Sequence, residues 1–350
     1  MTNFFNIIKE LCETPGIAGY ERKVAEILEK FMISKVDAIK IDRMGNLIAR
    51  KGDEDAKLKV LIATHMDEIG LMVKNIDENG FINFVKVGGI DDKLLIGRKV
   101  VIHGRKKVFG VIGVKPPHLE EKNEESKIPK CKEMFIDIGA KDRKDAEKYV
   151  SVGDPVTFYA ETTKLVNDLI TGKAFDDRLG CAVLVKLAEY GYPDDLCLYL
   201  VGTTQEEVGL KGARTVAYKI NPDIAIAIDV TPSGDYPPVK SENIPVKVGG
   251  GPVIEVLEAG GRGVISHPRI TEWLRKIAKE REIPYQINVG DGGMTDAAIM
   301  YITRAGIPSC SIGIATRYIH SQVEVASLKD VENTAKLLAI ALENISLLRL

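Results

Sequence analysis

Hydrophobic residues recur along the chain with two different periods, which predicts both helices and strands. Two helices open the chain, and the second has apolar residues at helical spacing: Val24, Ile27, Leu28 and Phe31. The segment KVLIATHMD that follows a hairpin-like stretch is apolar enough for a buried strand. The last helix is expected from about Leu328, with Ser327 as its N-cap.

The middle of the chain has a different pattern. From about Leu71 to about Lys164, short β-type runs are separated by turn signals, and Asn79-Gly80 predicts a tight hairpin. The segment KPPHLEEKNEESKIPKCKE is charged, bounded by proline and poor in apolar residues, so we expect a mobile surface loop. The pattern therefore predicts a small all-β, barrel-like domain at residues 71–163, inserted into a larger domain.

Strands and helices alternate again from about Leu165 to the end of the chain. The expected strands are LCLYLVG, DIAIAID, PYQINV and PSCSIGI, and the expected helices begin near Arg178, Leu210, Pro268 and Thr295. Mixed strands with helices on both flanks favour a layered α/β domain with a mixed sheet. Because the β-rich part interrupts it, we expect this domain to be discontinuous, comprising residues 1–70 and 164–350.

Composition narrows the class of protein. A hydrophobic fraction of 45%, a charged fraction of 28% and a net charge of −2 are typical of a globular protein, with neither a nucleic-acid nor a membrane partner. No apolar run reaches the roughly 18 residues of a membrane helix, and the N-terminal sequence lacks the regions of a signal peptide. The five cysteines are odd in number and show no CxxC pairing, which favours reduced thiols and a cytoplasmic location.

Polar residues gather at or just after the ends of the predicted strands, where open α/β sheets bind their ligands. They are His65 and Asp67 (ATHMDEIG), Asp176 and Asp177 (KAFDDRLG), Glu206 and Glu207 (TTQEEVGLKGA), Asp229 (IAIDVTPSGD) and His320 (RYIHSQVEV). Taken singly, a histidine on an apolar strand is more often a hydrogen-bonded core residue, and a pair of acids is more often a solvated turn. Five such places together are harder to explain that way, because buried carboxylates are costly unless they are paired or bind a cation.

The residue types in these clusters indicate which metals they suit. Two histidines with several carboxylates form a nitrogen and oxygen ligand set for Zn²⁺, Co²⁺ or Mn²⁺. One catalytic metal needs fewer ligands than are present, so a two-metal centre bridged by a carboxylate is the simplest interpretation. Ser-His-Asp chemistry has little support, because no GxSxG motif occurs. The glycine-rich segments GGRG and VGGG match neither a dinucleotide-binding fingerprint nor a P-loop.

Two alternatives of other classes stay open at this point. A glycoside hydrolase of the endoglucanase kind also uses paired carboxylates, but it has no need of His65 and His320. Its clefts tend to need aromatic platforms, whereas this chain has one tryptophan and 6% aromatic residues. A binding or assembly protein with a vestigial metal site is the second alternative, and the complete set of ligands disfavours it. Ligand spacing alone does not separate an aminopeptidase from a dimetal carboxypeptidase or deacylase.

Five segments in register carry a resemblance to a known family. HMDEIG, FDDRLG, TQEEVGLKGA, AIDVTPSGD and RYIHSQVEV resemble, in this order, the motifs of the tetrahedral (TET) aminopeptidases, which are co-catalytic dimetal peptidases. The resemblance covers essentially the whole chain, including the β insertion. One departure is visible at Met294, since the usual GGTDA of the family appears here as GGMTDA. The resemblance implies a zinc-exopeptidase type of fold and the removal of N-terminal residues from peptides.

The resemblance also implies a role for each candidate residue. Asp176 would bridge two Zn²⁺ or Co²⁺ ions, with Mn²⁺ as an alternative; His65 and Asp229 would complete one site, and Glu207 and His320 the other. Glu206 matches the general base, and Asp67 matches the hydrogen-bond partner of His65. A cis peptide is expected between Asp176 and Asp177. The roles of Asp177, Glu68, Arg178 and Arg317 stay open between contact with the site and simple structural pairing.

The expected partners follow from the same resemblance. They are peptide substrates and further copies of the chain, because members of the family build hollow tetrahedral dodecamers from dimers. The inserted β domain is the expected surface for dimerisation and assembly.

Overall fold

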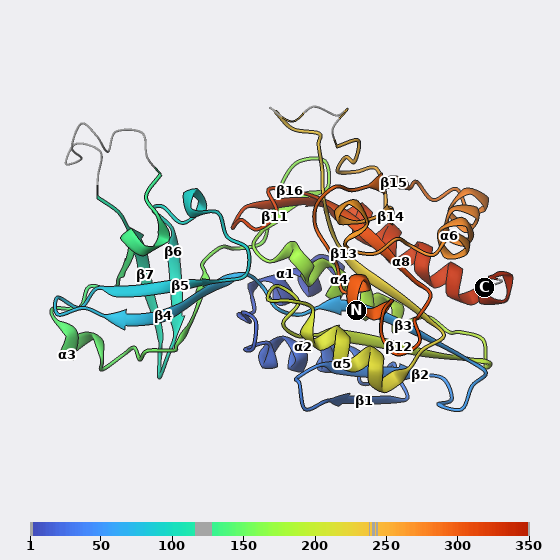
Figure 1. The fold of residues 1–350 in the computed structure, drawn as a ribbon, viewed down its shortest axis with the longest axis horizontal. Helices are drawn as coiled ribbons and strands as arrows, with labels where there is room; N and C mark the ends of the chain where they lie inside the picture. The colour runs from blue at the N-terminus through green and yellow to red at the C-terminus, as the bar shows by residue number, and fades with distance from the viewer. Residues whose placement is uncertain (1–2, 116–127, 238, 240–241, 243, 349–350) are drawn as a thin grey trace.

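The most apolar strands lie at the centre of a large mixed sheet (Figure 1). β3 (Leu58–His65), β12 (Leu196–Thr203), β13 (Ile224–Pro232) and β16 (Ser309–Arg317) run parallel to one another. Parallel strands that are buried on both faces have nearly continuous apolar sequences, as these do. The structure is a computed structural model, and it describes residues 3–115, 128–237, 239, 242 and 244–348.

Further strands extend this sheet on both sides. The order is β1-β2-β12-β3-β13-β16-β17-β11-β10, and β14 pairs with β16 and with β15. The bounds of these strands are β1 (Ala38–Ile41), β2 (Leu47–Lys51), β10 (Thr163–Lys164), β11 (Leu169–Gly172), β14 (Val253–Leu257), β15 (Gln286–Val289) and β17 (Glu324–Ser327).

Helices cover both faces of the sheet, because successive residues of a strand point to opposite sides. Val60 and Ile62 of β3 pack in the cluster formed with α1, α2, α4, α6 and α8, whereas Leu61 and Ala63 pack with α5 and α7. The bounds are α1 (Phe4–Glu13), α2 (Arg22–Met32), α4 (Phe175–Leu187), α5 (Lys211–Ile220), α6 (Pro268–Glu280), α7 (Ala297–Met300) and α8 (Leu328–Glu343). The predicted layered α/β architecture with a mixed sheet is confirmed.

The β-rich middle of the chain forms a closed antiparallel barrel beside the larger domain (Figure 1). Its strands are β4 (Gly70–Ile76), β5 (Ile82–Val87), β6 (Lys99–His103), β7 (Lys107–Gly113), β8 (Phe135–Asp137) and β9 (Pro155–Phe158), with the short helix α3 (Arg143–Ala146) before β9. The barrel has a hydrophobic core of its own. The predicted inserted barrel is therefore confirmed, while the domain limits 71–163 stay a prediction. Most of the charged loop falls outside the described residues.

Three local features refine the expectations. Ser327 caps α8 as predicted, accepting a hydrogen bond from the backbone N–H of Asp330. The turn at Asn79-Gly80 is wider than a tight hairpin: Ile76 pairs with Ile82, and the Asp77 carboxylate accepts hydrogen bonds from two backbone N–H groups of the loop. α7 is a single short turn rather than a full helix. Within the described ranges, every helix is too short or too polar to cross a bilayer.

Candidate metal centre

The predicted ligands meet at the carboxyl edge of the sheet. His65 is the last residue of β3, Glu206 and Glu207 follow β12, and Asp229 lies near the end of β13. Asp176 stands at the start of α4, and the loop after β16 carries the fifth cluster, with His320. Parallel strands deliver all these side chains to one edge, which is why residues far apart in the sequence become neighbours.

Asp176 lies between the two histidines. Its Oδ1 is 2.9 Å from His65 Nε2, and its Oδ2 is 3.2 Å from His320 Nε2. Each histidine also has a second carboxylate: Asp229 Oδ1 is 3.7 Å from His65 Nε2, and Glu207 Oε1 is 3.1 Å from His320 Nε2. The geometry is thus two histidine–carboxylate pairs that share one carboxylate.

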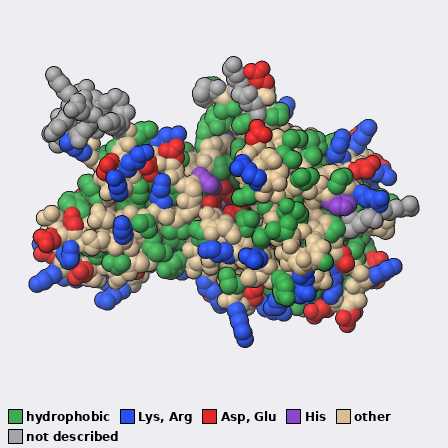
Figure 2. Space-filling model, in the orientation of Figure 1, with side chains coloured by type: hydrophobic (Ala, Val, Ile, Leu, Met, Phe, Trp, Pro, Cys, Tyr) green, Lys and Arg blue, Asp and Glu red, His purple; other side chains and the backbone are tan. Residues whose placement is uncertain are grey.

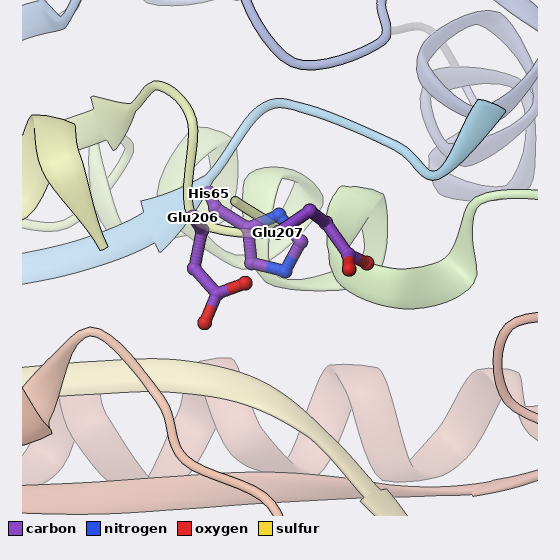
Figure 3. A group of neighbouring side chains, drawn as sticks. All are labelled: His65, Glu206 and Glu207. Carbon is purple, nitrogen blue, oxygen red and sulfur yellow. The ribbon is translucent and has the colours of Figure 1, made fainter. Parts of the chain in front are cut away.

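Glu206 lies beside this constellation. Figure 3 shows the imidazole of His65 between the carboxylates of Glu206 and Glu207, which come from the loop after β12. One ligand atom of each of the three residues lies within 4.8 Å of the others. Glu206 therefore reaches the same space as the proposed ligands.

Asp67 makes contacts that the sequence interpretation did not include. Its carboxylate accepts hydrogen bonds from the backbone N–H groups of Glu206 (3.0 Å) and Glu207 (3.1 Å). The Nδ1 of His65 is 3.1 Å from the carbonyl oxygen of Asp67 and 3.6 Å from its carboxylate. Asp67 therefore contacts His65 mainly through its backbone, and its side chain fixes the loop that carries the two glutamates.

Two further features lie in the backbone around the centre. The peptide bond between Asp176 and Asp177 is cis, as the resemblance implies. Glu324 is a buried residue that the sequence interpretation missed: it accepts hydrogen bonds from the backbone N–H groups of Phe175 (2.6 Å) and His320 (2.9 Å). It thereby joins the two segments that supply Asp176 and His320. Its place within the RYIHSQVEV segment is the sequence signal that could have identified it.

The protonation of the centre reflects a strongly negative environment. Burial opposes charge on both histidines, yet hydrogen bonds to the carboxylates prevail; the pKa of His65 is held well above its usual range, and that of His320 is raised to about 11. Although burial favours the neutral acid, hydrogen bonds from both histidines lower the pKa of Asp176. Burial raises the pKa of Asp229 to about 7 and holds that of Glu206 well above its usual range.

The residues present fit divalent cations. Four carboxylates, of Asp176, Glu206, Glu207 and Asp229, converge on two histidines. The neighbouring buried cations serve other groups: Arg178 donates to backbone carbonyls, including those of Leu11 and Met66, and Lys173 pairs with Glu68 at 2.7 Å. Buried carboxylates need compensating positive charge, and histidine with carboxylate is a ligand set that Zn²⁺ and related ions accept.

The four residues whose roles were left open have structural partners. Arg178 is fully buried among backbone carbonyls, and Glu68 also accepts a hydrogen bond from the backbone N–H of Gly16. The Asp177 carboxylate accepts hydrogen bonds from the Thr64 hydroxyl and from the backbone N–H of Gly180. Arg317 pairs with Asp235. These contacts are made to groups other than the proposed ligands, although a carboxylate oxygen of Asp177 lies within 4.8 Å of ligand atoms of His65 and Asp229.

A cavity of about 450 Å³ opens onto the centre. Asp176, Glu206, Glu207, Asp229 and His320 line one end of it. Figure 2 shows acidic side chains and a histidine gathered in a recess near the barrel. The candidate ligands thus border a space that a small substrate can enter.

Comparisons with known proteins agree with this geometry. The family model described as M42 glutamyl aminopeptidase matches residues 45–337. The chain belongs to this family. A putative aminopeptidase of Acetivibrio thermocellus is 42% identical over 340 residues, which are 97% of this chain and 98% of that protein. The recognition of the TET aminopeptidases from sequence is confirmed, and the protein is a metal-dependent aminopeptidase, a hydrolase of peptide bonds.

Solved structures support the same family. The aminopeptidase APDkam598 of Desulfurococcus kamchatkensis superimposes with a TM-score of 0.93 at 40% identity, covering 97% of this chain and 94% of that one. The TET1 peptidase of Pyrococcus horikoshii does so with a TM-score of 0.86 at 31% identity, over 97% and 99% of the two chains. That peptidase has been solved as a dodecamer and can assemble into a tetrahedron or a large octahedral shell.

Proposed function

We propose that this M42 peptidase removes N-terminal residues with two divalent cations and with Glu206 as general base. One cation would be held by His65, Asp176 and Asp229, and the other by Asp176, Glu207 and His320. The observation that carries the proposal is the position of Asp176, whose two carboxylate oxygens face two different histidines. Zn²⁺ and Co²⁺ suit this ligand set, and Mn²⁺ is the alternative.

The cations would lower the pKa of a bound water and polarise the scissile carbonyl. The protein supplies the proton transfer. The backbone N–H of Glu206 donates to Asp67, which holds the residue beside His65. From there its carboxylate would take a proton from water and pass it to the leaving amine. Burial raises its pKa, which brings a carboxylate closer to the range in which it serves as a base near neutral pH.

The replacement Glu206→Gln tests the assignment of the base. The amide keeps the size of the side chain and cannot accept the proton, so we expect turnover to fall about 10²- to 10⁴-fold with the metal content unchanged. Hydrolysis of aminoacyl p-nitroanilides and elemental analysis measure the two quantities. Glu332→Gln, the same change at an exposed position of α8, is the control. Turnover near that of the wild type would show that another group is the base.

Removal of the metal tests the number and kind of ions. Treatment with EDTA should abolish hydrolysis, and Zn²⁺ or Co²⁺ should restore it with two ions per chain. Activity that survives complete removal of metal would contradict the proposal and would favour the glycosidase alternative if carbohydrate were cleaved. Substoichiometric binding in an inactive protein would favour the assembly-protein alternative.

The remaining proposals concern assembly and location. We propose a homo-oligomer, a tetrahedral dodecamer built from dimers, in which residues 71–163 form the assembly domain and residues 1–70 and 164–350 the catalytic domain. The dodecameric relative supports this. Light scattering at the mass of a monomer would exclude it. A cytoplasmic location is supported by the five cysteines, all of which are free.

A further inference from the structure

The cavity continues beyond the metal centre to a second pair of carboxylates. Glu255 and Glu258 line its far end, together with Thr231, Asn288 and Thr295. Neither glutamate belongs to the motifs that carry the family resemblance. Both are at most 5% exposed, so each is a buried acid whose presence in the cavity wall calls for an explanation.

Glu255 and Asp229 lie on the same face of the sheet. Asp229 pairs with Gly313 across β13 and β16, while Glu255 pairs with Ser311 of β16 and with Asn288 of β15. Cross-strand partners point to the same side. Two strand spacings and a two-residue offset separate the Cα atoms of Asp229 and Glu255 by roughly 10–12 Å.

Glycine at position 313 makes room for the Thr231 side chain beside Glu255. A Cβ atom added there would collide with Thr231 Oγ1 and lie 3.2 Å from Glu255 Oε1. A larger residue would therefore displace the Thr231 hydroxyl that donates a hydrogen bond to Glu255.

Both oxygens of Glu255 are fixed by neutral groups. Oε1 accepts a hydrogen bond from the Thr231 hydroxyl (2.7 Å) and Oε2 accepts one from the Asn288 amide (2.9 Å). A carboxylate has about four acceptor positions, so these bonds orient it and leave capacity for another donor. Because burial supplies no countercharge, the pKa of Glu255 is raised to about 7.

The ionisable residues that line the cavity are nearly all acidic. Its lining within the described part of the chain contains six carboxylates and one histidine, His320, and neither lysine nor arginine. Two divalent cations would offset the four carboxylates of the metal centre. The charge at the far end, where Glu258 hydrogen-bonds Thr295, would still be uncompensated.

We propose that Glu255 selects peptides whose N-terminal side chain ends in a cation, that is, lysine or arginine. The inference rests on the proposed function, since the peptide's α-amine and scissile bond must lie at the metal centre. Lysine and arginine have a long apolar stem and a charged end. Leu257 and Met294 line the cavity and offer the stem an apolar wall, and Glu255 accepts hydrogen bonds from the end.

Other side chains fit this cavity less well. A leucine side chain would cover Glu255 without giving it a donor, and a glutamate side chain would bring a like charge beside it. Sites that provide buried polar groups discriminate strongly against analogues that leave those groups unpaired. The description of the family as glutamyl aminopeptidase therefore does not fit the cavity of this member.

The test compares kcat/KM of the metal-loaded, full-length protein for the p-nitroanilides of lysine, arginine, leucine and glutamate. In the wild type we expect lysine and arginine to exceed leucine by about tenfold or more, and glutamate by a larger factor. Glu255→Gln should lower kcat/KM for lysine and arginine about tenfold or more, while the value for leucine changes little. Glu255→Asp keeps the charge and should keep the cationic preference.

Controls separate this inference from the proposed function. Glu280→Gln makes the same change on the exposed side of α6 and should leave all four substrates unaffected. A wild type that prefers leucine or glutamate would overturn the inference and leave the aminopeptidase intact. So would an unchanged ratio of lysine to leucine in Glu255→Gln. If no substrate were cleaved, both the inference and the proposed function would fail. The comparison of the four substrates in the wild type tests the inference even if Glu255→Gln does not fold.

Discussion

Replacement of Glu324 by glutamine is the sharpest test of how the metal centre is held together. Glu324 begins β17 and is 1% exposed. Its Oε2 accepts hydrogen bonds from the backbone N–H groups of Phe175 (2.6 Å) and Asp176 (3.4 Å), and its Oε1 accepts one from the backbone N–H of His320 (2.9 Å). One carboxylate therefore fixes the backbone positions of Asp176, the proposed shared ligand, and of His320.

Glutamine has the same shape but only one accepting oxygen. Whichever way the amide is turned, its NH₂ group faces a backbone N–H, either that of Phe175 or that of His320. A hydrogen bond to a charged group contributes about 1.5–3 kcal/mol. The variant loses such a bond on one side and places an NH₂ group against a backbone N–H, so the free energy of the assembled centre should rise by at least that amount. Loss of groups that orient metal ligands typically weakens metal binding about 10- to 100-fold. At about 1.4 kcal/mol per tenfold, the two estimates agree.

The assay is a Zn²⁺ titration against a competing chelator, with Glu332→Gln on the exposed face of α8 as the matched control. We expect the Glu324 variant to bind at least one ion about 10- to 100-fold more weakly, and to lose hydrolytic activity at limiting metal and regain it at saturating metal. An affinity within twofold of the wild type would refute the role of Glu324 in positioning Asp176 and His320.

Three further predictions concern other contacts. Asp67→Asn removes one of the acceptors that fix the backbone of Glu206 and its neighbour, so kcat/KM should fall about tenfold or more in steady-state assays, and a wild-type value would contradict this. Lys173→Met leaves the buried Glu68 with Arg178 Nη2, at 3.8 Å, as its remaining cation, which should lower the free energy of unfolding by up to about 3 kcal/mol in thermal denaturation; adding Glu68→Gln should recover much of the loss. Burial lowers the pKa of His103 from 6.5 to about 4, so its stabilising contribution is present above pH 6.5 and lost as the pH falls toward 4. His103→Gln should therefore reduce the loss of stability between pH 7 and pH 5 by about 1–2 kcal/mol, and equal losses would contradict it.

The sequence is informative about the centre because the sheet determines where its side chains go. Parallel strands end at one edge, so a histidine at the end of β3 and acids after β12 and in β13 are neighbours once the strand order is fixed. The apolar runs identify the strands, and the polar residues that interrupt them stand out against that background. The candidates from His65 to His320 could therefore be grouped before any distance was known.

Contacts to backbone groups could not be predicted from the sequence in this way. The resemblance implies that Asp67 is the hydrogen-bond partner of His65, and the atom of Asp67 closest to Nδ1 is its carbonyl oxygen, while its carboxylate accepts hydrogen bonds from the backbone of the Glu206–Glu207 loop. Glu324 likewise accepts hydrogen bonds from backbone N–H groups, and those of Phe175 and Asp176 are far away in the sequence. Every residue except proline carries a backbone N–H, so no residue type marks where a buried carboxylate will find one.

Substrate preference depends on another kind of information, the register between strands. Glu255 faces the cavity because Ser311 and Asn288 pair with it; a shift of one residue would turn it to the opposite face. Motifs identify the residues proposed to hold the metals, and two divalent cations would offset the charge of their carboxylates. Nothing in the metal centre requires an acid at the far end of the cavity. An acid at position 255 is therefore more informative about the substrate than any motif that identifies the family.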